Sequence, residues 1–419
     1  MLVAILPIGA LLTSVALLLM GNGLQGVLLP VRALAEDFSS FEVGILGASY
    51  YLGYGAGCVL GPFAVRRVGH IRTFAAFVSI AASLVLIHGL FTTPSIWWLA
   101  RAGTGFSLAS LYLVIESWLN ERSTQENRGA IFSVYTIVNL TVVTLGQMML
   151  PLASPQEFSL FALAAVLVCL SAIPVCMSVA AAPTPPSAVH IRLRHLYRLS
   201  PVGVVGAFSV GLANGAFWSL GPIFAQRDAA DTAAVAIFMS IAVLAGALGQ
   251  WPFGKLSDRM DRRRVIIAAS VGAALAAISL VFTARHWEPG ILIAVGLFGI
   301  CALPVYAICA AHLNDQVESD GYVEASSGLN LLFAAGAVAG PILASVTMRY
   351  QGVEGLFLYT AVIHAILAAF AAYRMKRKVI RIVEERADFL ETLVQCRTVA
   401  EIDTRTETDD EDSPKQEGS

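Results

Sequence analysis

Residues 235–264 read VAIFMSIAVLAGALGQWPFGKLSDRMDRRR. The first nineteen of these positions carry no charge, whereas positions 254–264 hold five basic and two acidic side chains. An uncharged run of about 20 residues has the length of a helix that crosses a lipid bilayer. The stretch therefore predicts a membrane helix that ends in a strongly charged loop.

The rest of the chain repeats this pattern. Of its 419 residues 57% are hydrophobic and 13% are charged, and the mean hydropathy is +0.72, whereas about 25% of residues are charged in soluble proteins. Twelve apolar stretches of spanning length follow one another at 3–29, 41–64, 73–92, 97–117, 130–151, 158–180, 202–223, 233–253, 265–284, 290–311, 325–348 and 355–373. We predict an all-α, multi-pass protein of the inner (plasma) membrane.

The distribution of basic residues predicts the orientation of the chain. With a cytoplasmic N-terminus, the inner loops hold thirteen basic residues, namely Arg66, Arg67, Arg72, Arg122, Arg128, Arg192, Arg194, Arg198, Lys255, Arg259, Arg262, Arg263 and Arg264. The outer loops then hold four, namely Arg32, Arg227, Arg285 and Arg349. Because Lys and Arg accumulate in cytoplasmic loops, both termini are expected in the cytoplasm.

An internal repeat divides the chain into two halves. A shift of 192 positions places NGLQGVLLP (22–30) on NGAFWSLGP (214–222), and a shift of 194 places LNE (119–121) on LND (313–315). Repeats of this kind are common in transporters. The prediction is two pseudo-symmetric six-helix halves at 1–180 and 201–374, joined by a cytoplasmic linker at 181–200. Residues 375–419 are expected to form a cytoplasmic tail with an amphipathic helix and then a disordered acidic end.

Two six-span halves with a central linker resemble the major facilitator superfamily. The family pattern G-x-L-x-D-R-x-G-R-R between the second and third spans of a half is matched by Gly254, Leu256, Asp258, Arg259, Arg262 and Arg263, with Asp261 at the usual second glycine. Its first-half copy keeps Arg67, Gly69 and Arg72 but has Arg66 at the acidic position. The runs IESWLNE (115–121) and GQ (146–147) look most like the YcaD-like branch.

The charged loops suggest a gate. An acid beside fixed guanidinium groups could hold neighbouring helix ends together and release them when the halves rock. The candidate gate, or charge latch, comprises Arg66, Arg67, Gly69, Arg72, Glu116, Arg128, Gly254, Asp258, Arg259, Arg262 and Arg263. The alternative is that these residues only anchor the topology, and for Glu116 a structural ion pair is favoured over a proton carrier.

The polar residues inside the spans are the candidate substrate-binding groups. An ionisable side chain inside a membrane helix costs free energy, so its presence there favours a functional role. Arg101 could bind an anionic group or a partner acid, or it could extend to the outer surface. The resemblance places the first and fourth spans of each half at a cavity. The candidate cavity set is Asn22, Gln25, Tyr54, Arg101, Asn139, Gln147, Asn214, Trp218, Tyr306 and Asn330, although each could equally join two helices.

The favoured function is a secondary transporter that moves a small organic solute by alternating access, with export preferred to uptake. The alternative is a transporter-like sensor or assembly protein that acts through its tail. We expect a monomer in the lipid bilayer that binds a small-molecule substrate and, depending on the coupling mode, a proton or another ion. Without a phosphate-binding loop, a metal-ligand cluster or a catalytic triad, we expect no enzyme activity, cofactor, metal or nucleic-acid partner.

Overall fold

The computed structural model describes residues 8–123, 127–177, 188–189, 192–226, 231–286, 288–317, 321–377 and 401–402. Residues 181–187 and 190–191 of the linker and most of the tail, including the predicted amphipathic helix and acidic end, lie outside the described residues. The side chain of Arg128 lies outside them as well.

Twelve helices in the described part of the chain are long and apolar enough to cross a membrane. The first half contains α2 (Gly9–Ala35), α3 (Ser40–Val68), α4 (His70–Leu90), α5 (Pro94–Glu121), α6 (Arg128–Gln147) with the short η2 (Leu150–Leu152), and α7 (Ser159–Leu170) with α8 (Ala172–Cys176). The second contains α10 (Pro201–Ala225), α11 (Thr232–Arg259), α12 (Arg262–His286), α13 (Glu288–Ala302) with α14 (Val305–Asn314), α15 (Tyr322–Gln351) and α16 (Gly355–Arg377). The sixth and tenth spans are thus each built from two helices.

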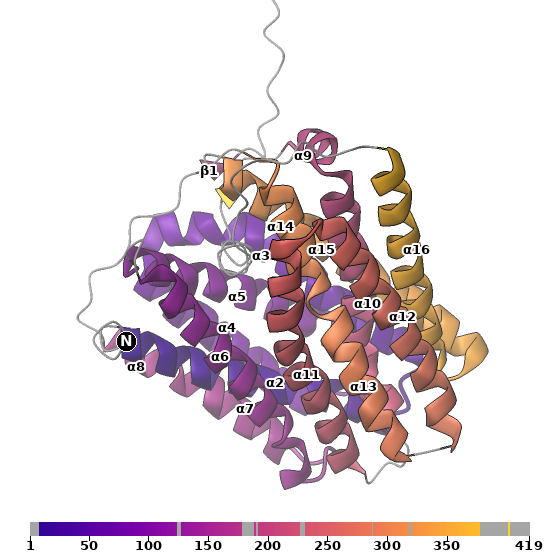
Figure 1. Cartoon of the computed structure of the whole chain (residues 1–419). Helices are drawn as coiled ribbons and strands as arrows, with labels where there is room; N and C mark the ends of the chain where they lie inside the picture. The colour runs from indigo at the N-terminus through magenta and orange to yellow at the C-terminus, as the bar shows by residue number, and fades with distance from the viewer. Residues whose placement is uncertain are drawn as a thin grey trace, which may run out of the picture.

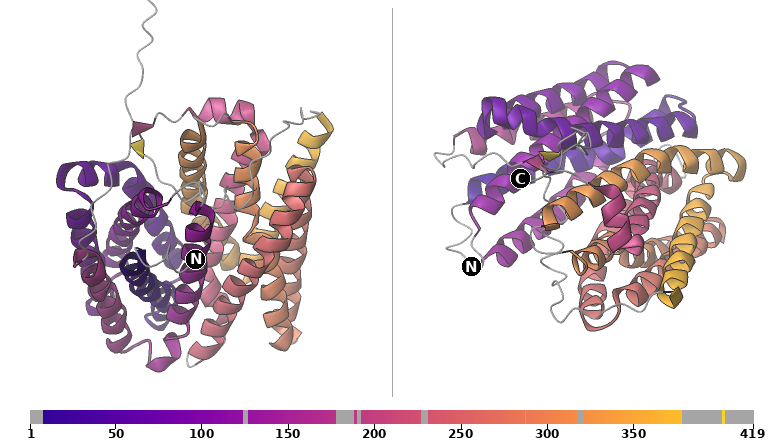
Figure 2. Two further views of the ribbon diagram at one scale, coloured as in Figure 1. Left: turned by 60° about the vertical axis from the view of Figure 1, so that its left-hand side comes forward. Right: turned by 90° about the horizontal axis from the view of Figure 1, so that it is seen from above.

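The predicted repeat is reproduced by the helix boundaries. Helices α2, α3 and α4 begin 192 positions before α10, α11 and α12, and α5 and α6 begin 194 positions before α13 and α15. The two-residue change in offset falls where the sequence repeat places it. The fold is therefore two pseudo-symmetric six-helix halves, which lie side by side in Figures 1 and 2.

Within the first half, glycines let two helices touch along their backbones. Gly53, Gly57 and Gly61 recur every four residues on α3 and face α5. A Cβ atom at Gly57 would lie 2.5 Å from the carbonyl oxygen of Phe106, which is too close for any side chain. Small residues at membrane-helix contacts serve this purpose because they allow backbones to approach. Helices α3 and α5 are consequently held in one relative position.

The contact between the halves runs along α3. Near its start, a Cβ at Gly44 would lie 2.9 Å from the Cβ of Ser345 on α15, and one at Gly47 would meet the side chain of Ser219 on α10. Further along, the ring of Tyr51 lies 6.4 Å from that of Phe333. We call the end of the bundle where α3 starts and α10 ends the far end. The end where α3 ends and α10 starts is the linker end.

The linker segment lies against the second half. Helix α9 (Leu193–Leu199) precedes α10 at the linker end (Figure 1). The backbone N–H of Arg192 donates to Glu324 Oε1 of α15 at 2.9 Å, and its Nη2 donates to Oε2 at 3.0 Å. The two-residue strands β1 (Ala188–Val189) and β2 (Glu401–Ile402) pair in parallel, so a short segment of the tail meets the linker.

The surface of the helices suits a lipid environment. Large apolar side chains are strongly exposed on several spans, for example Leu99 at 76%, Leu248 at 73% and Trp251 at 72%. Monomeric soluble proteins rarely expose extended apolar surface of this kind. Together with the twelve apolar helices, this surface identifies a multi-pass membrane protein.

Candidate substrate cavity and charged loops

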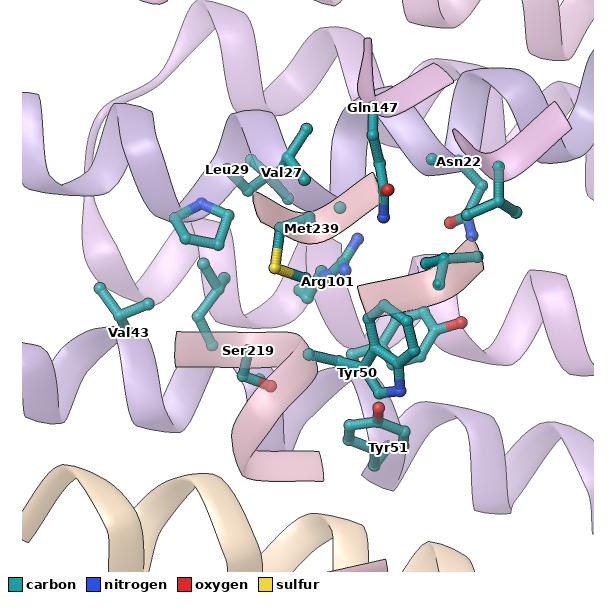
Figure 3. A pocket seen from close by; sticks show the side chains of 18 of the residues that line it. Asn22, Val27, Leu29, Val43, Tyr50, Tyr51, Arg101, Gln147, Ser219 and Met239 are labelled. Carbon is teal, nitrogen blue, oxygen red and sulfur yellow. The ribbon is translucent and has the colours of Figure 1, made fainter. Parts of the chain in front are cut away.

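A cavity of about 310 Å³ lies between the two halves. Its walls come from α2, α3, α5 and α6 of the first half and from α10 and α11 of the second. The lining residues are Asn22, Gly23, Gly26, Val27, Leu29, Pro30, Val43, Leu46, Gly47, Tyr50, Tyr51, Arg101, Tyr112, Asn139, Leu140, Val143, Gln147, Trp218, Ser219, Met239 and Val243. Figure 3 shows the labelled side chains around the space. The volume is at the lower end of the range for small-molecule sites.

Arg101 supplies the charge of this cavity. It is placed by the close packing of α3 and α5, because Gly105, one turn further along α5, lies directly against the backbone of Tyr50 and Tyr54. The guanidinium carbon lies 4.5 Å from the centre of the Tyr50 ring, in a cation–π arrangement. Its buried Nη1 has no hydrogen-bond partner among the described residues. The group is therefore presented to the cavity with part of its bonding capacity unused.

Two amide side chains face the same space from α2 and α6. The Oδ1 of Asn22 and the Oε1 of Gln147 are buried and have no hydrogen-bond partner among the described residues. These helices touch closely because Gly23 lies against the backbone of Val143 and Gly146 against that of Met20. Figure 3 shows the Gln147 amide directed into the space in which Arg101 lies. A buried polar atom without a partner is costly, so these atoms are suited to bind a ligand.

The second half contributes a different surface. Trp218 and Ser219 come from α10, and Met239 and Val243 come from α11. Met239 and the facing Val43 and Leu46 are almost completely buried, and beyond them the halves meet at Gly44. The cavity is thus covered at its far end by apolar side chains. Its charged group and its unpartnered amide oxygens belong to the first half.

The structure brings five of the ten predicted cavity residues to this space, namely Asn22, Arg101, Asn139, Gln147 and Trp218. Sequence reasoning missed Tyr50, Tyr51, Tyr112 and Ser219, which also line it. For Tyr50 and Tyr51 a signal was present. Both residues precede the glycine series Gly53, Gly57 and Gly61, and rings beside such a series are set close to the facing helix.

The other five predicted cavity residues do not line this space. Gln25 and Asn214 are buried within the helix packing at 1% and 6% exposure. Tyr54 packs its ring 6.5 Å from that of Tyr112. The hydroxyl of Tyr306 donates to Asn330 Oδ1 at 2.6 Å, which joins α14 to α15 inside the second half. Asn22 and Asn214, which align in the sequence repeat, are consequently not equivalent, since only Asn22 faces the cavity.

Arg262 is the centre of the charged loop in the second half. Its Nε and Nη2 donate to the two carboxylate oxygens of Asp315 at 2.7 and 3.2 Å, and its Nη1 donates to Ser257 Oγ at 2.7 Å and Asp258 Oδ1 at 3.2 Å. The Arg262 side chain is only 2% exposed. These bonds tie together the ends of α11 and α14 and the start of α12. Arg259, another member of the candidate gate, is exposed.

Asp261 forms the turn in this loop. Its Oδ1 accepts from the backbone N–H of Arg263 at 2.9 Å, and its Oδ2 accepts from Arg263 Nη2 at 2.8 Å. Burial alone would raise the pKa of this carboxyl, but the hydrogen bonds and the charge of Arg263 outweigh burial and hold the pKa below its usual range. Asp261 thus replaces the expected glycine by capping the start of α12. Gly254 is buried in the last turns of α11.

The corresponding loop of the first half is built differently. Gly69 occupies the position of Asp261 and has a φ of +83°, a conformation that glycine adopts readily. His70 stands at the position of Arg262 and is 2% exposed. Arg66, Arg67 and Arg72 are exposed, and the Arg66 guanidinium carbon lies 4.7 Å from the centre of the Phe63 ring. This loop therefore lacks the buried arginine of the second half.

Glu116, the acidic member of the candidate gate in the first half, lies on α5. The residue is only 3% exposed. It belongs to the interior of the first half.

Comparisons with known proteins agree with the geometry. The model of the Major Facilitator Superfamily matches residues 11–228 and 203–397. The chain is 25% identical over 362 residues to the uncharacterized MFS-type transporter YcaD of Escherichia coli strain UTI89, covering 85% of this chain and 92% of that protein.

Solved structures show the same fold. The crystal structure of the nucleoside transporter NupG superposes with a TM-score of 0.71 at 14% identity, over 88% of this chain and 100% of that one. A bacterial homolog of the human lysosomal transporter Spinster, in an inward-facing and occupied conformation, superposes with a TM-score of 0.67 at 14% identity, over 88% and 96% of the two chains. With the twelve spans and the repeat, these matches show that the chain belongs to the Major Facilitator Superfamily and has its fold.

Proposed function

We propose that the protein is a secondary transporter that moves a small organic solute by alternating access, with the cavity between its halves as the substrate site. The observation that carries this proposal is the position of the cavity. It is lined by both halves and holds a charged group and unpartnered amide oxygens. A site at the interface of two repeats can face each side of the membrane in turn when the repeats rock.

The moving units are proposed to be residues 1–180 and 201–374, connected by residues 181–200. Inside each unit, helices meet along their backbones, as at Gly53 and Ala102 in the first half and at Gly211 and Phe333 in the second. Such contacts cannot slide without a clash, which favours motion of each half as a body.

The proposed orientation places the linker end and both termini in the cytoplasm of a cell whose inner membrane holds the protein. The support is the excess of basic residues at the linker end, counted above. In this orientation the cavity is covered on the extracellular side, where Gly44 and Gly47 lie against the second half. A solute would then enter the present conformation from the cytoplasm, which fits export as the proposed direction. The protein is proposed to act as a monomer, coupled to a proton or another ion.

The experiment that tests this proposal is a screen for ligands, followed by measurement of the flux of each ligand across a membrane. A ligand that binds the folded protein raises its unfolding temperature, so a library of metabolites and drugs is screened against the purified full chain at two pH values. Hits are then tested for uptake and release in proteoliposomes with and without a pH gradient. Gln147→Ala should lose the hit, whereas Gln156→Ala, a matched change in an exposed loop, should keep it. Binding hits with no flux in either direction would contradict the proposal.

A further inference from the structure

The cavity contains a cation without an acidic partner. None of the described residues that line it is acidic, and Arg101 Nη1 has no hydrogen-bond partner in the same part of the chain. The contact described for the guanidinium is the face of the Tyr50 ring. Burying a charged arginine side chain inside the membrane-spanning bundle costs free energy unless a charge of opposite sign compensates it.

Of the acidic side chains of the first half near the far end, Asp37 and Glu157 are exposed, and Glu36 and Glu42 are engaged in contacts of their own. Glu42 accepts hydrogen bonds from the backbone N–H and the hydroxyl of Ser39, both at 2.8 Å, and so caps α3. Glu36 forms an ion pair of 2.6 Å with Arg32 one turn earlier on α2. These contacts are local and at the helix ends. The compensating charge for Arg101 is therefore expected to come from outside the chain.

The remaining groups of the cavity define the rest of the ligand. The unpartnered oxygens of Asn22 and Gln147 are hydrogen-bond acceptors and call for a donor on the ligand. The rings of Tyr50, Tyr51 and Trp218 supply flat apolar surface, on which an aromatic or compact apolar body can pack. A guanidinium fork binds carboxylate and phosphate groups in the same bidentate way.

We infer that the cavity binds a small organic anion, whose carboxylate or phosphate group pairs with Arg101 and whose apolar body lies against Tyr50, Tyr51 and Trp218. This inference rests on the proposed function, because it assigns a substrate class to the same cavity. It also gives the two halves different tasks. The first half holds the polar groups of the ligand, and the second half covers its apolar part.

The test uses four probes that share a benzene ring and differ in charge, namely benzoate, phenyl phosphate, benzamide and benzylamine. Binding to the purified full chain is measured by calorimetry and by quenching of tryptophan fluorescence. A charge-assisted hydrogen bond is worth about 1.5–3 kcal/mol, or roughly 10- to 100-fold in affinity. At least one of the two anions should bind more tightly than benzamide by about this factor, and benzylamine should bind least.

Three variants locate the effect. Arg101→Gln should remove the preference for anions, and Arg101→Lys should restore part of it because the charge is kept. Arg349→Gln, an exposed arginine of α15 near the far end, is the matched control and should behave like the unmodified protein. If Arg101→Gln does not fold, reaction of the unmodified protein with phenylglyoxal, which attacks arginine side chains, replaces it. Benzoate should protect Arg101 from the reagent and benzylamine should not.

The outcomes separate this inference from the proposed function. Equal binding of benzamide or benzylamine, anion binding that survives Arg101→Gln, or binding of none of the four probes would overturn the inference. Transport of a neutral or cationic solute that Arg101→Gln leaves intact would also overturn it while the transporter proposal stands. Anion binding at Arg101 without flux of any bound anion would support the inference and refute the transporter.

Discussion

Contacts inside a half and contacts between the halves are of different kinds. Inside a half, glycines meet backbone atoms of the facing helix, as Gly105 does at Tyr50, and the buried Arg262 ties three helix ends together. Between the halves, Gly47 meets the side chain of Ser219, and Gly44 meets the side chain of Ser345 and the carbonyl oxygen of Pro341 near the far end. A buried ion pair resists separation because each charge would lose its partner, whereas the van der Waals contacts at Gly44 and Gly47 can part without leaving a charge unpaired. This difference supports the proposal that the halves move as two bodies with a separable contact.

Breaking the charged network inside the second half should have the largest effect. Arg262→Met leaves Asp315, whose side chain is 12% exposed, without its bidentate partner. Removing one member of a buried pair costs about 3–5 kcal/mol. The free energy of unfolding should fall by about that amount in denaturant titrations. Arg259→Met, in the same loop but exposed, should change it by less than about 0.5 kcal/mol. Similar losses for both variants would show that the network is not what stabilises the loop.

Adding a methyl group between α3 and α5 should have the next largest effect. Gly105→Ala places a Cβ against the carbonyl of Tyr50, where the backbone must move, and overpacking of this kind costs about 1–3 kcal/mol. Because the shift displaces Tyr50 from Arg101, binding of an anionic probe should weaken as well. Gly129→Ala, where a Cβ meets nothing within 4 Å, is the matched control. Unchanged stability in Gly105→Ala would mean that the two helices are not rigidly joined.

A change at the edge of the network should affect turnover more than stability. Asp258 is 35% exposed and accepts a hydrogen bond of 3.2 Å from Arg262 Nη1. Asp258→Asn should lower the rate of transport by a few fold, while substrate affinity, set in the distant cavity, stays the same. The measurement is the concentration dependence of flux for a confirmed substrate. Weaker binding with a normal maximal rate would count against a role of this loop in the conformational change.

The smallest effect concerns pH. The pKa of Asp261 is held below its usual value, so its pair with Arg263 stabilises the fold above the unfolded carboxyl pKa of about 4. That contribution is lost as the pH falls through the lower folded pKa. Because the side chain is 27% exposed, about 1 kcal/mol or less is expected. The difference in unfolding temperature between the unmodified protein and Asp261→Asn should be constant above about pH 5 and shrink towards pH 3.

The fold could be predicted from the sequence because its signals are local. The length of the apolar stretches predicted the membrane spans, and matches such as NGLQGVLLP with NGAFWSLGP predicted the repeat. The cavity was predictable only in part, because facing a cavity depends on the rotation of each helix. Asn22 and Asn214 align in the repeat, yet Asn22 faces the cavity and Asn214 is buried among helices. The partner of Arg262 was missed for a related reason, since Asp315 is 53 positions away and only packing brings it close.

The central claim is that two rigid halves rock about the cavity. It is tested most directly by measuring distances between pairs of spin labels in a variant that weakens the contact between the halves at the far end. Gly47→Val adds bulk where a Cβ meets the Ser219 side chain, whereas Gly55→Val, where a Cβ lies 3.8 Å from Ala334, is the control. Labels are attached in pairs at the exposed positions 41 and 350 at the far end, 66 and 259 at the linker end, and 67 and 99 within the first half, after replacement of the six native cysteines.

Rigid halves that rock about the cavity predict three results together in Gly47→Val. The far-end distance should lengthen, the linker-end distance should shorten, and the distance within the first half should stay the same as in Gly55→Val. A changed distance within the first half, or unchanged distances at both ends, would contradict the account.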